Sequence, residues 1–199
     1  MNLRSYGVLA TAAVLVLSGC SAGADGPDES AARGSVSITN CGRQTEFPTP
    51  ARRMFVNDSN LISMVLALGA EDQVAAVSSI GRDEEVLAEH YGDAVAGLNQ
   101  VSDDYPSLET VVAARPDVMV AGWSYGYDET KQLTPDSLAE RDVAAYVLTE
   151  SCRQAGSSAR GIVDPWTALR EDLTNLGAIT GHEDRATQDR KSTRLNSSH

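Results

Sequence analysis

The strongest candidates for ligand binding are three aromatic side chains in one five-residue segment. Trp123, Tyr125 and Tyr127 stand together although only 5% of the chain is aromatic, and they directly follow an apolar run that ends at Gly122. Indole and phenol rings stack on planar or extended ligands, and tyrosine hydroxyls can hydrogen-bond polar groups of the same molecule. We expect these rings to contact a ligand; the alternative is that Trp123 packs against a neighbouring loop.

Three polar residues in or beside predicted loops are further candidates. The Arg82 guanidinium could pair with carboxylate, hydroxamate or catecholate oxygens of an anionic ligand, or it could form a surface ion pair with Asp83 or Glu84. Arg153, which follows a cysteine, offers the same chemistry. Asn57 could contact the ligand or cap the helix that is predicted to follow it.

No catalytic or metal-binding motif stands out in the sequence. It contains no P-loop, no glycine-rich dinucleotide fingerprint after a strand, and no G-x-S-x-G elbow around Ser78. His90, His182 and His199 are isolated from one another, whereas a metal site needs several converging ligands. We therefore expect a protein that is not an enzyme and that holds no metal or cofactor of its own.

The net charge argues against one class of partner. The chain carries a formal charge of -12 at pH 7. Binding to nucleic acid needs clustered lysine and arginine side chains that neutralise phosphates, so we expect no nucleic-acid partner. The acidic residues are typical of a solvated surface.

The amino terminus predicts export and a lipid anchor. Arg4 precedes an eleven-residue apolar stretch, 7–17, which suits a signal peptide and is too short to span a bilayer as a helix. The segment Leu17-Ser18-Gly19-Cys20 resembles the bacterial lipobox, in which the cysteine is acylated. We expect Cys20 to hold the protein on the extracytoplasmic face of the cell membrane. The alternative is an ordinary secretory signal with a chance cysteine.

Cysteine usage fits the same compartment. The chain has three cysteines, and if Cys20 carries lipid, Cys41 and Cys152 remain. In an oxidising environment this even remainder predicts one disulfide, with two free thiols as the alternative. Closing a loop of about 110 residues would stabilise the fold by about 4–5 kcal/mol.

Strand and helix signals alternate along the chain. Predicted strands cover 36–39, 53–57, 73–78, 117–122 and 143–149, and predicted helices cover 61–68, 83–91, 107–114, 135–141 and 164–177. This alternation predicts an α/β fold, a Rossmann-like lobe whose mainly parallel sheet is flanked by helices on both faces. The loops at the carboxyl ends of the strands should then form the binding crevice.

Five short phrases occur in order along the chain. They are Pro50-Ala51-Arg52-Arg53, Leu66-Ala67-Leu68-Gly69-Ala70-Glu71-Asp72-Gln73-Val74, Pro106-Ser107-Leu108-Glu109, Ala114-Arg115-Pro116-Asp117-Val118 and Leu176-Gly177-Ala178-Ile179-Thr180-Gly181. Together, behind the lipobox, they resemble the substrate-binding proteins of ABC importers for iron–siderophore complexes and cobalamin. The segments 39–43 and 150–152, with their cysteines, resemble an actinobacterial iron–siderophore branch of that family.

The resemblance implies two α/β lobes joined by a rigid helix, with the ligand between the lobes. It implies a monomer that captures an iron(III)–siderophore and delivers it to a membrane permease powered by a cytoplasmic ATPase. The siderophore itself would coordinate the iron. Cobalamin or haem is the alternative ligand within the family, and an extracellular α/β enzyme or a ligand-sensing lipoprotein is the alternative from another class.

The resemblance also divides the chain into segments. We expect a signal peptide over 1–20, a flexible polar tether over 21–35 and the N-terminal lobe over 36–182. The joining helix would begin at 183, and the second lobe is absent from this sequence. Residues 190–199 lack apolar periodicity and resemble a translated sequencing-adapter tail, so they do not enter the prediction of the fold.

Overall fold

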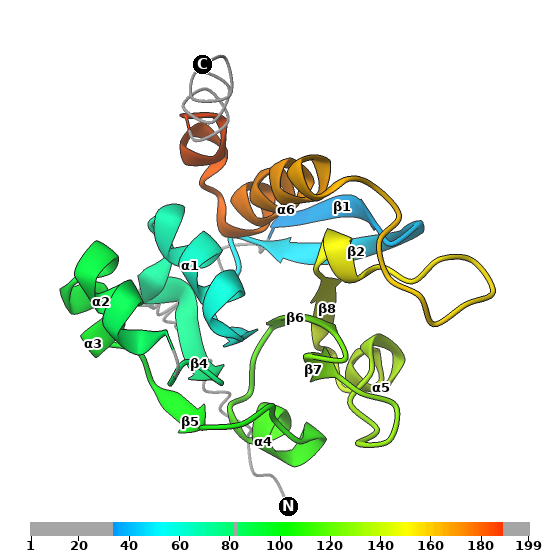
Figure 1. The fold of residues 1–199 in the computed structure, drawn as a ribbon, viewed down its shortest axis with the longest axis horizontal. Coiled ribbons are helices and arrows are strands. Elements are labelled where there is room, and N and C mark those ends of the chain that lie inside the picture. Colours follow the sequence, from blue (N-terminus) through cyan, green and yellow to red (C-terminus); the bar gives the residue numbers. More distant parts are fainter. Residues whose placement is uncertain (1–33, 82, 189–199) are drawn as a thin grey trace, which may run out of the picture. The chain divides into compact units, whose positions relative to one another are not determined.

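A computed structural model describes residues 34–81 and 83–188, and the predicted signal peptide, Cys20, Arg82 and the tail at 189–199 lie outside these residues. In the described part, six parallel strands form one sheet in the order β5-β4-β3-β6, with β7 and β8 both paired to β6 (Figure 1). The strands are β3 (Met54–Asn57), β4 (Val74–Ser78), β5 (Gln100–Ser102), β6 (Val118–Trp123), β7 (Gly126–Tyr127) and β8 (Ala144–Val147). The predicted α/β fold with a mainly parallel sheet is confirmed.

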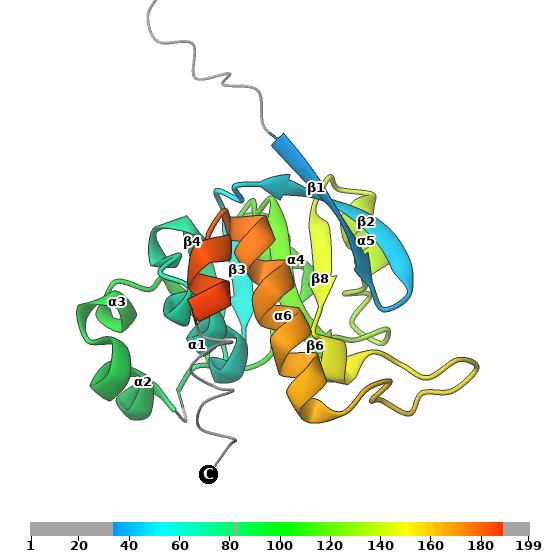
Figure 2. The same cartoon turned by 90° about the horizontal axis from the view of Figure 1, so that it is seen from above.

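Helices cover both faces of this sheet (Figure 2). They are α1 (Ser59–Ala67), α2 (Glu84–Tyr91), α3 (Asp93–Ala96), α4 (Leu108–Ala113), α5 (Pro135–Ala139) and α6 (Pro165–Thr180), with the short 3-10 turns η1 (Glu71–Gln73) and η2 (Thr149–Ser151). Because strand side chains alternate between faces, Val120 of β6 packs in the core under α1 and α6, whereas Met119 packs in the core under α4 and α5. Two apolar cores therefore hold the sheet from both sides.

An antiparallel hairpin packs beside the edge strand β8. It consists of β1 (Gly34–Asn40) and β2 (Arg43–Thr49). The Asn40 side chain pairs with the backbone of Val147, because its Nδ2 donates to Val147 O and its Oδ1 accepts from Val147 N, both at 2.8 Å. The predicted Cys41–Cys152 disulfide is confirmed and links the hairpin turn to the loop after η2, across 111 residues of sequence.

Local signals explain where the helices begin. Asp164 Oδ1 accepts from the backbone N–H groups of Trp166 and Thr167, each at 3.1 Å, so the predicted start of α6 is confirmed. The predicted end near Gly177 was wrong, because α6 continues to Thr180. At Gly177 a Cβ would lie 2.8 Å from Ala186 Cβ, so this glycine lets the segment after α6 pack closely against the helix.

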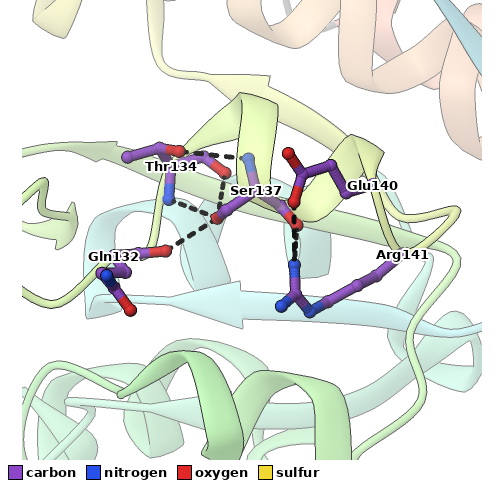
Figure 3. A network of polar contacts seen from close by, with 5 residues as sticks. All are labelled: Gln132, Thr134, Ser137, Glu140 and Arg141. Atoms are coloured by element: carbon purple, nitrogen blue, oxygen red, sulfur yellow. Dashed lines mark hydrogen bonds and ion pairs between the residues drawn. The ribbon is translucent and has the colours of Figure 1, made fainter.

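A capping box starts α5 at the edge of the sheet (Figure 3). Thr134 Oγ1 accepts from Ser137 N at 3.1 Å, and Ser137 Oγ accepts in return from Thr134 N at 3.0 Å. Arg141 donates to the carbonyl of Ser137 at 2.6 Å and pairs with Glu140 at 3.6 Å, which holds the other end of the same short helix. Leu138 is thereby buried against β8.

Elements without a strong apolar pattern were not predicted. They are β2, β5, β7 and α3. The strand β2 reads RQTEFPT, so only Phe47 is fully buried in it. None of the helices in the described ranges is both long and apolar enough to cross a membrane.

Candidate ligand-binding site

The chain reverses its direction across the sheet between β3 and β6. From β3 it proceeds outward through β4 to β5, and it then returns to place β6 on the other side of β3. In open α/β sheets, ligands bind outside the carboxyl ends of the strands at such a switch point. Here the strands end at Asn57 and Trp123, so two of the predicted site residues mark the switch point.

Asn57 joins three loops at this edge. Its side chain is fully buried, its Oδ1 accepts from Ser78 Oγ at 2.9 Å and its Nδ2 donates to Tyr125 O at 2.9 Å. Gly126 makes room for this amide, since a Cβ at that position would lie 3.0 Å from Asn57 Nδ2 and 2.6 Å from Ala121 Cβ. Asn57 therefore fixes the backbone of the aromatic segment, residues 123–127, at Tyr125.

Backbone strain gathers at the same edge. Asp58, Ser79 and Ser124 directly follow β3, β4 and β6, and their φ angles are 78°, 59° and 68°. Non-glycine residues rarely adopt positive φ, and such residues cluster at binding and catalytic sites where surrounding contacts hold them. Three of the seven such residues in the described part of the chain lie here, which is consistent with a binding site at this edge.

The indole of Trp123 lies under an arginine. The guanidinium carbon of Arg153 lies 3.9 Å from the centre of the Trp123 ring, and Arg153 Nη1 pairs with Glu129 Oε1 at 2.7 Å. Trp123 is partly exposed, and its backbone N–H donates to Ser151 Oγ at 3.1 Å. The ring is thus fixed from its backbone and stacked on a cation.

A second arginine covers the second ring. The Arg160 guanidinium carbon lies 5.4 Å from the centre of the Tyr125 ring, and Arg160 Nη1 donates to Trp123 O at 3.2 Å. The Tyr125 hydroxyl donates to the Glu150 carboxylate. Burial, followed by the Glu150 carboxylate, raises the pKa of Tyr125, so this phenol keeps its proton.

Tyr127 lies behind Trp123. Its ring centre is 5.8 Å from that of Trp123, and its side chain is fully buried. The hydroxyl shares its one proton between Met119 O at 3.0 Å and Tyr146 O at 3.1 Å, and burial raises the pKa of Tyr127. The structure gives Tyr127 a supporting position, and ligand contact by its side chain stays a prediction.

A short finger, residues 153–160, carries both arginines. Arg153 and Arg160 face each other in an antiparallel bridge, and Gln154 N donates to Ala159 O at 2.8 Å. Gly161 N donates to Cys152 O at 3.1 Å, and the disulfide to Cys41 holds the base of the finger. Arg160 was not predicted as a site residue; the glycine and serines at 156–158 indicate a turn that brings the finger back on itself.

Trp123 also lines a groove of about 500 Å³. The hairpin, α5 and β8 line it, and the ion pair between Arg43 and Asp136, at 2.9 Å, crosses from the hairpin to α5. The groove continues the surface at Trp123 past β8 toward the hairpin and α5.

Comparison with known proteins identifies the fold. No family model matches the sequence, and no curated protein matches it. Solved structures do match. An ABC-type Fe3+-hydroxamate transport system protein from Saccharomonospora viridis matches at 22% identity, with a TM-score of 0.63, over 80% of this chain and 53% of that one. A periplasmic binding protein from Veillonella parvula matches at 19% identity, TM-score 0.65, over 82% and 50%. The catecholate-siderophore binding protein VctP from Vibrio cholerae matches at 18% identity, TM-score 0.56, over 80% and 50%.

The fold is that of one lobe of a periplasmic binding protein. The chain spans about half the length of these solved structures. At identities of 22% or less, the likeness establishes the periplasmic-binding-protein fold and not the ligand.

On this fold, the structure brings some predicted site residues together. Trp123, Tyr125 and Arg153 meet at the carboxyl edge, with Asn57 beneath them and Tyr127 behind. Arg82 lies outside the described residues. Within residues 34–81 and 83–188, no group of three histidine, cysteine or carboxylate side chains is placed to hold a metal ion.

Proposed function

We propose that this chain is the ligand-binding lobe of an extracytoplasmic solute-binding lipoprotein that serves an ABC importer, and that its cargo is an iron(III)–siderophore. The observation that carries the proposal is the pair of arginines stacked on Trp123 and Tyr125 at the carboxyl edge of the sheet. The fold shared with solved periplasmic binding proteins supports the general role.

The chemistry of the cluster suits an iron chelate with oxygen donors at its surface. Hydroxamate and catecholate groups present partly anionic oxygens around the metal, and guanidinium groups donate to such oxygens in a planar fork. The rings of Trp123 and Tyr125 offer flat apolar area to the organic backbone of the chelator. A chelate brings its own metal ligands, so the protein supplies only shape, rings and hydrogen bonds.

The mechanism we propose is capture and delivery without covalent chemistry. Cys20, by its lipobox, would anchor the protein near its permease, and the polar tether would let the folded lobe reach it. At the carboxyl edge the hydroxyl of Tyr125 is held by the Glu150 carboxylate. The proposal assigns the protein to transport because its fold is shared with solved periplasmic binding proteins.

A binding panel tests this function. The purified chain is titrated by calorimetry with the iron(III) complexes of desferrioxamine B, a trihydroxamate, and enterobactin, a tricatecholate, and with the iron-free chelators, haem and cyanocobalamin. We expect saturable binding of at least one ferric chelate, weakened by Arg160→Ala and unchanged by Arg141→Ala, a surface arginine in the turn after α5. Binding of haem or cobalamin alone would transfer the role to that ligand, and no binding at all would contradict the proposal.

A further inference from the structure

The one charged side chain buried in the described part of the chain belongs to α6. Asp172 is 1% exposed. Its Oδ1 accepts three hydrogen bonds, from Tyr146 Oη at 2.7 Å, Thr149 N at 2.9 Å and Thr149 Oγ1 at 2.6 Å. A single carboxylate oxygen thus bonds the Tyr146 side chain of β8 and both donors of Thr149, the first residue of η2.

The turn η2 leads directly to the aromatic cluster. Glu150, its second residue, accepts from the Tyr125 hydroxyl. Ser151, its third residue and fully buried, accepts from Trp123 N at 3.1 Å and donates to Leu148 O at 2.8 Å. Two consecutive residues of one short turn therefore hold the Tyr125 hydroxyl and the Trp123 backbone, and both of these aromatic residues are partly exposed.

The next residues anchor the arginine finger. Cys152 follows η2 and is joined to Cys41, and Arg153 stacks on Trp123. The segment 149–153 is consequently held on one side by α6 and on the other by the hairpin. It contacts Trp123 and Tyr125 at three points. Glu150 accepts from the Tyr125 hydroxyl, Ser151 accepts from the Trp123 backbone N–H, and Arg153 stacks on the Trp123 ring.

We propose that Asp172 is a positioning residue for the ligand site: it fixes η2, and η2 fixes Trp123 and Tyr125. The expected effect of Asp172 on ligand binding rests on the proposed function. Its expected effect on Trp123 and Tyr125 does not, because that effect is present without ligand.

The cost of burying this group supports the assignment. An isolated buried carboxylate is unfavourable, and an apolar side chain of similar size commonly packs as well or better. Leu or Ala at position 172 could not accept hydrogen bonds. The Asp172 carboxylate accepts from both the backbone N–H and the hydroxyl of Thr149 through one oxygen. These contacts leave the donors of Thr149 satisfied inside the core, where an orphaned donor is costly.

The variants separate positioning from general stability. Asp172→Ala removes all three bonds, whereas Asp172→Asn keeps an Oδ1 acceptor with nearly the same shape. Thr149→Val removes the hydroxyl donor alone. Ile179→Ala, buried two turns further along α6, is the control that weakens the same core without touching η2. All are made in Trp166→Phe, because Trp123 and Trp166 are the two tryptophans of the chain and the latter is 63% exposed.

The experiment records Trp123 without ligand and then with it, under conditions where each variant is folded. In Asp172→Ala we expect a shifted or broadened indole N–H resonance and about twofold greater acrylamide quenching. The affinity for the iron(III) complex of desferrioxamine B should fall about tenfold, as expected for displaced hydrogen-bond partners. Asp172→Asn should restore all three readouts, and Ile179→Ala should leave them unchanged.

An unchanged Trp123 signal in folded Asp172→Ala would overturn the inference, as would an equal change in Ile179→Ala. If Asp172→Ala does not fold, Thr149→Val decides, with a smaller change in the same direction expected. If the parent chain binds no ferric chelate, the proposed function fails while the ligand-free signals still decide the positioning role.

Discussion

The guanidinium carbon of Arg153 lies 3.9 Å from the centre of the Trp123 ring; Trp123 ends β6, and Arg153 follows β8 and the turn η2. They are thirty residues apart in sequence and meet only because β6 and β8 are neighbours. Glu129 holds the same guanidinium at 2.7 Å, so Arg153 is oriented in a plane over the ring before any ligand arrives.

Replacing this arginine should weaken ligand binding more than a change of charge alone. Arg153→Ala should reduce the affinity for a ferric chelate about tenfold, since it removes both the stacked cation and its hydrogen-bond fork. Arg153→Lys should recover less than half of that loss in free energy, because an ammonium cannot stack in the same way. Calorimetry measures both, with Arg141→Ala as the control. Full recovery by lysine would show that charge alone matters.

The disulfide should stabilise the lobe strongly. The double variant Cys41→Ser/Cys152→Ser should lose about 2–5 kcal/mol in the free energy of unfolding, because the bond closes a long loop of the unfolded chain. Urea unfolding followed by circular dichroism measures this loss. Reduction of the parent chain with dithiothreitol should give the same loss, and an unchanged midpoint in either case would contradict the expectation.

Gly126 should tolerate no side chain. Its φ is 118°, and a Cβ there would lie 2.6 Å from Ala121 Cβ. Gly126→Ala should therefore cost about 2 kcal/mol or more in the free energy of unfolding. Gly156 also has positive φ, at 70°, but open space around it, so Gly156→Ala should cost about 1 kcal/mol. Equal losses in urea unfolding would remove the argument for close packing at Gly126.

Asp172 should make the stability of the lobe depend on pH. Burial raises its pKa above the ordinary value of 3.8, and the neighbouring Glu171 carboxylate acts in the same direction, while the Tyr146 hydroxyl, whose own pKa is raised, stays protonated. The folded state thus binds the proton more tightly than the unfolded state. The stabilising contribution is complete below the unfolded pKa and is lost as pH rises through the folded pKa.

The comparison with Asp172→Asn isolates this contribution. The free energy of unfolding of the parent minus that of the variant should fall as the pH rises above 3.8, the ordinary aspartate pKa, because other groups cancel in the difference. Urea unfolding at a series of pH values measures it. A difference that is flat, or that rises with pH, would show that the folded state does not favour the protonated carboxyl.

The sequence predicts the strands and rings of the site better than the tertiary contacts that hold them. Apolar runs such as 117–122 predict buried strands, and aromatic density points to Trp123 and Tyr125, because both signals are local. Arg160 and Asp172 were not predicted, since their roles depend on contacts with Tyr125 and Thr149 that only the folded chain creates. Tyr127 shares the composition of its neighbours, yet the pairing of β7 with β6 turns it into the core.

The central claim is that Trp123 lies at a binding site for ferric chelates. The most direct measurement is the fluorescence of Trp123 in the Trp166→Phe chain, titrated with the iron(III) complexes of desferrioxamine B and enterobactin and with the iron-free chelators. We predict saturable quenching by at least one ferric complex, with the midpoint shifted to higher concentration by Arg153→Ala. Quenching that does not saturate, or that is equal in the Arg153→Ala chain, would contradict the claim.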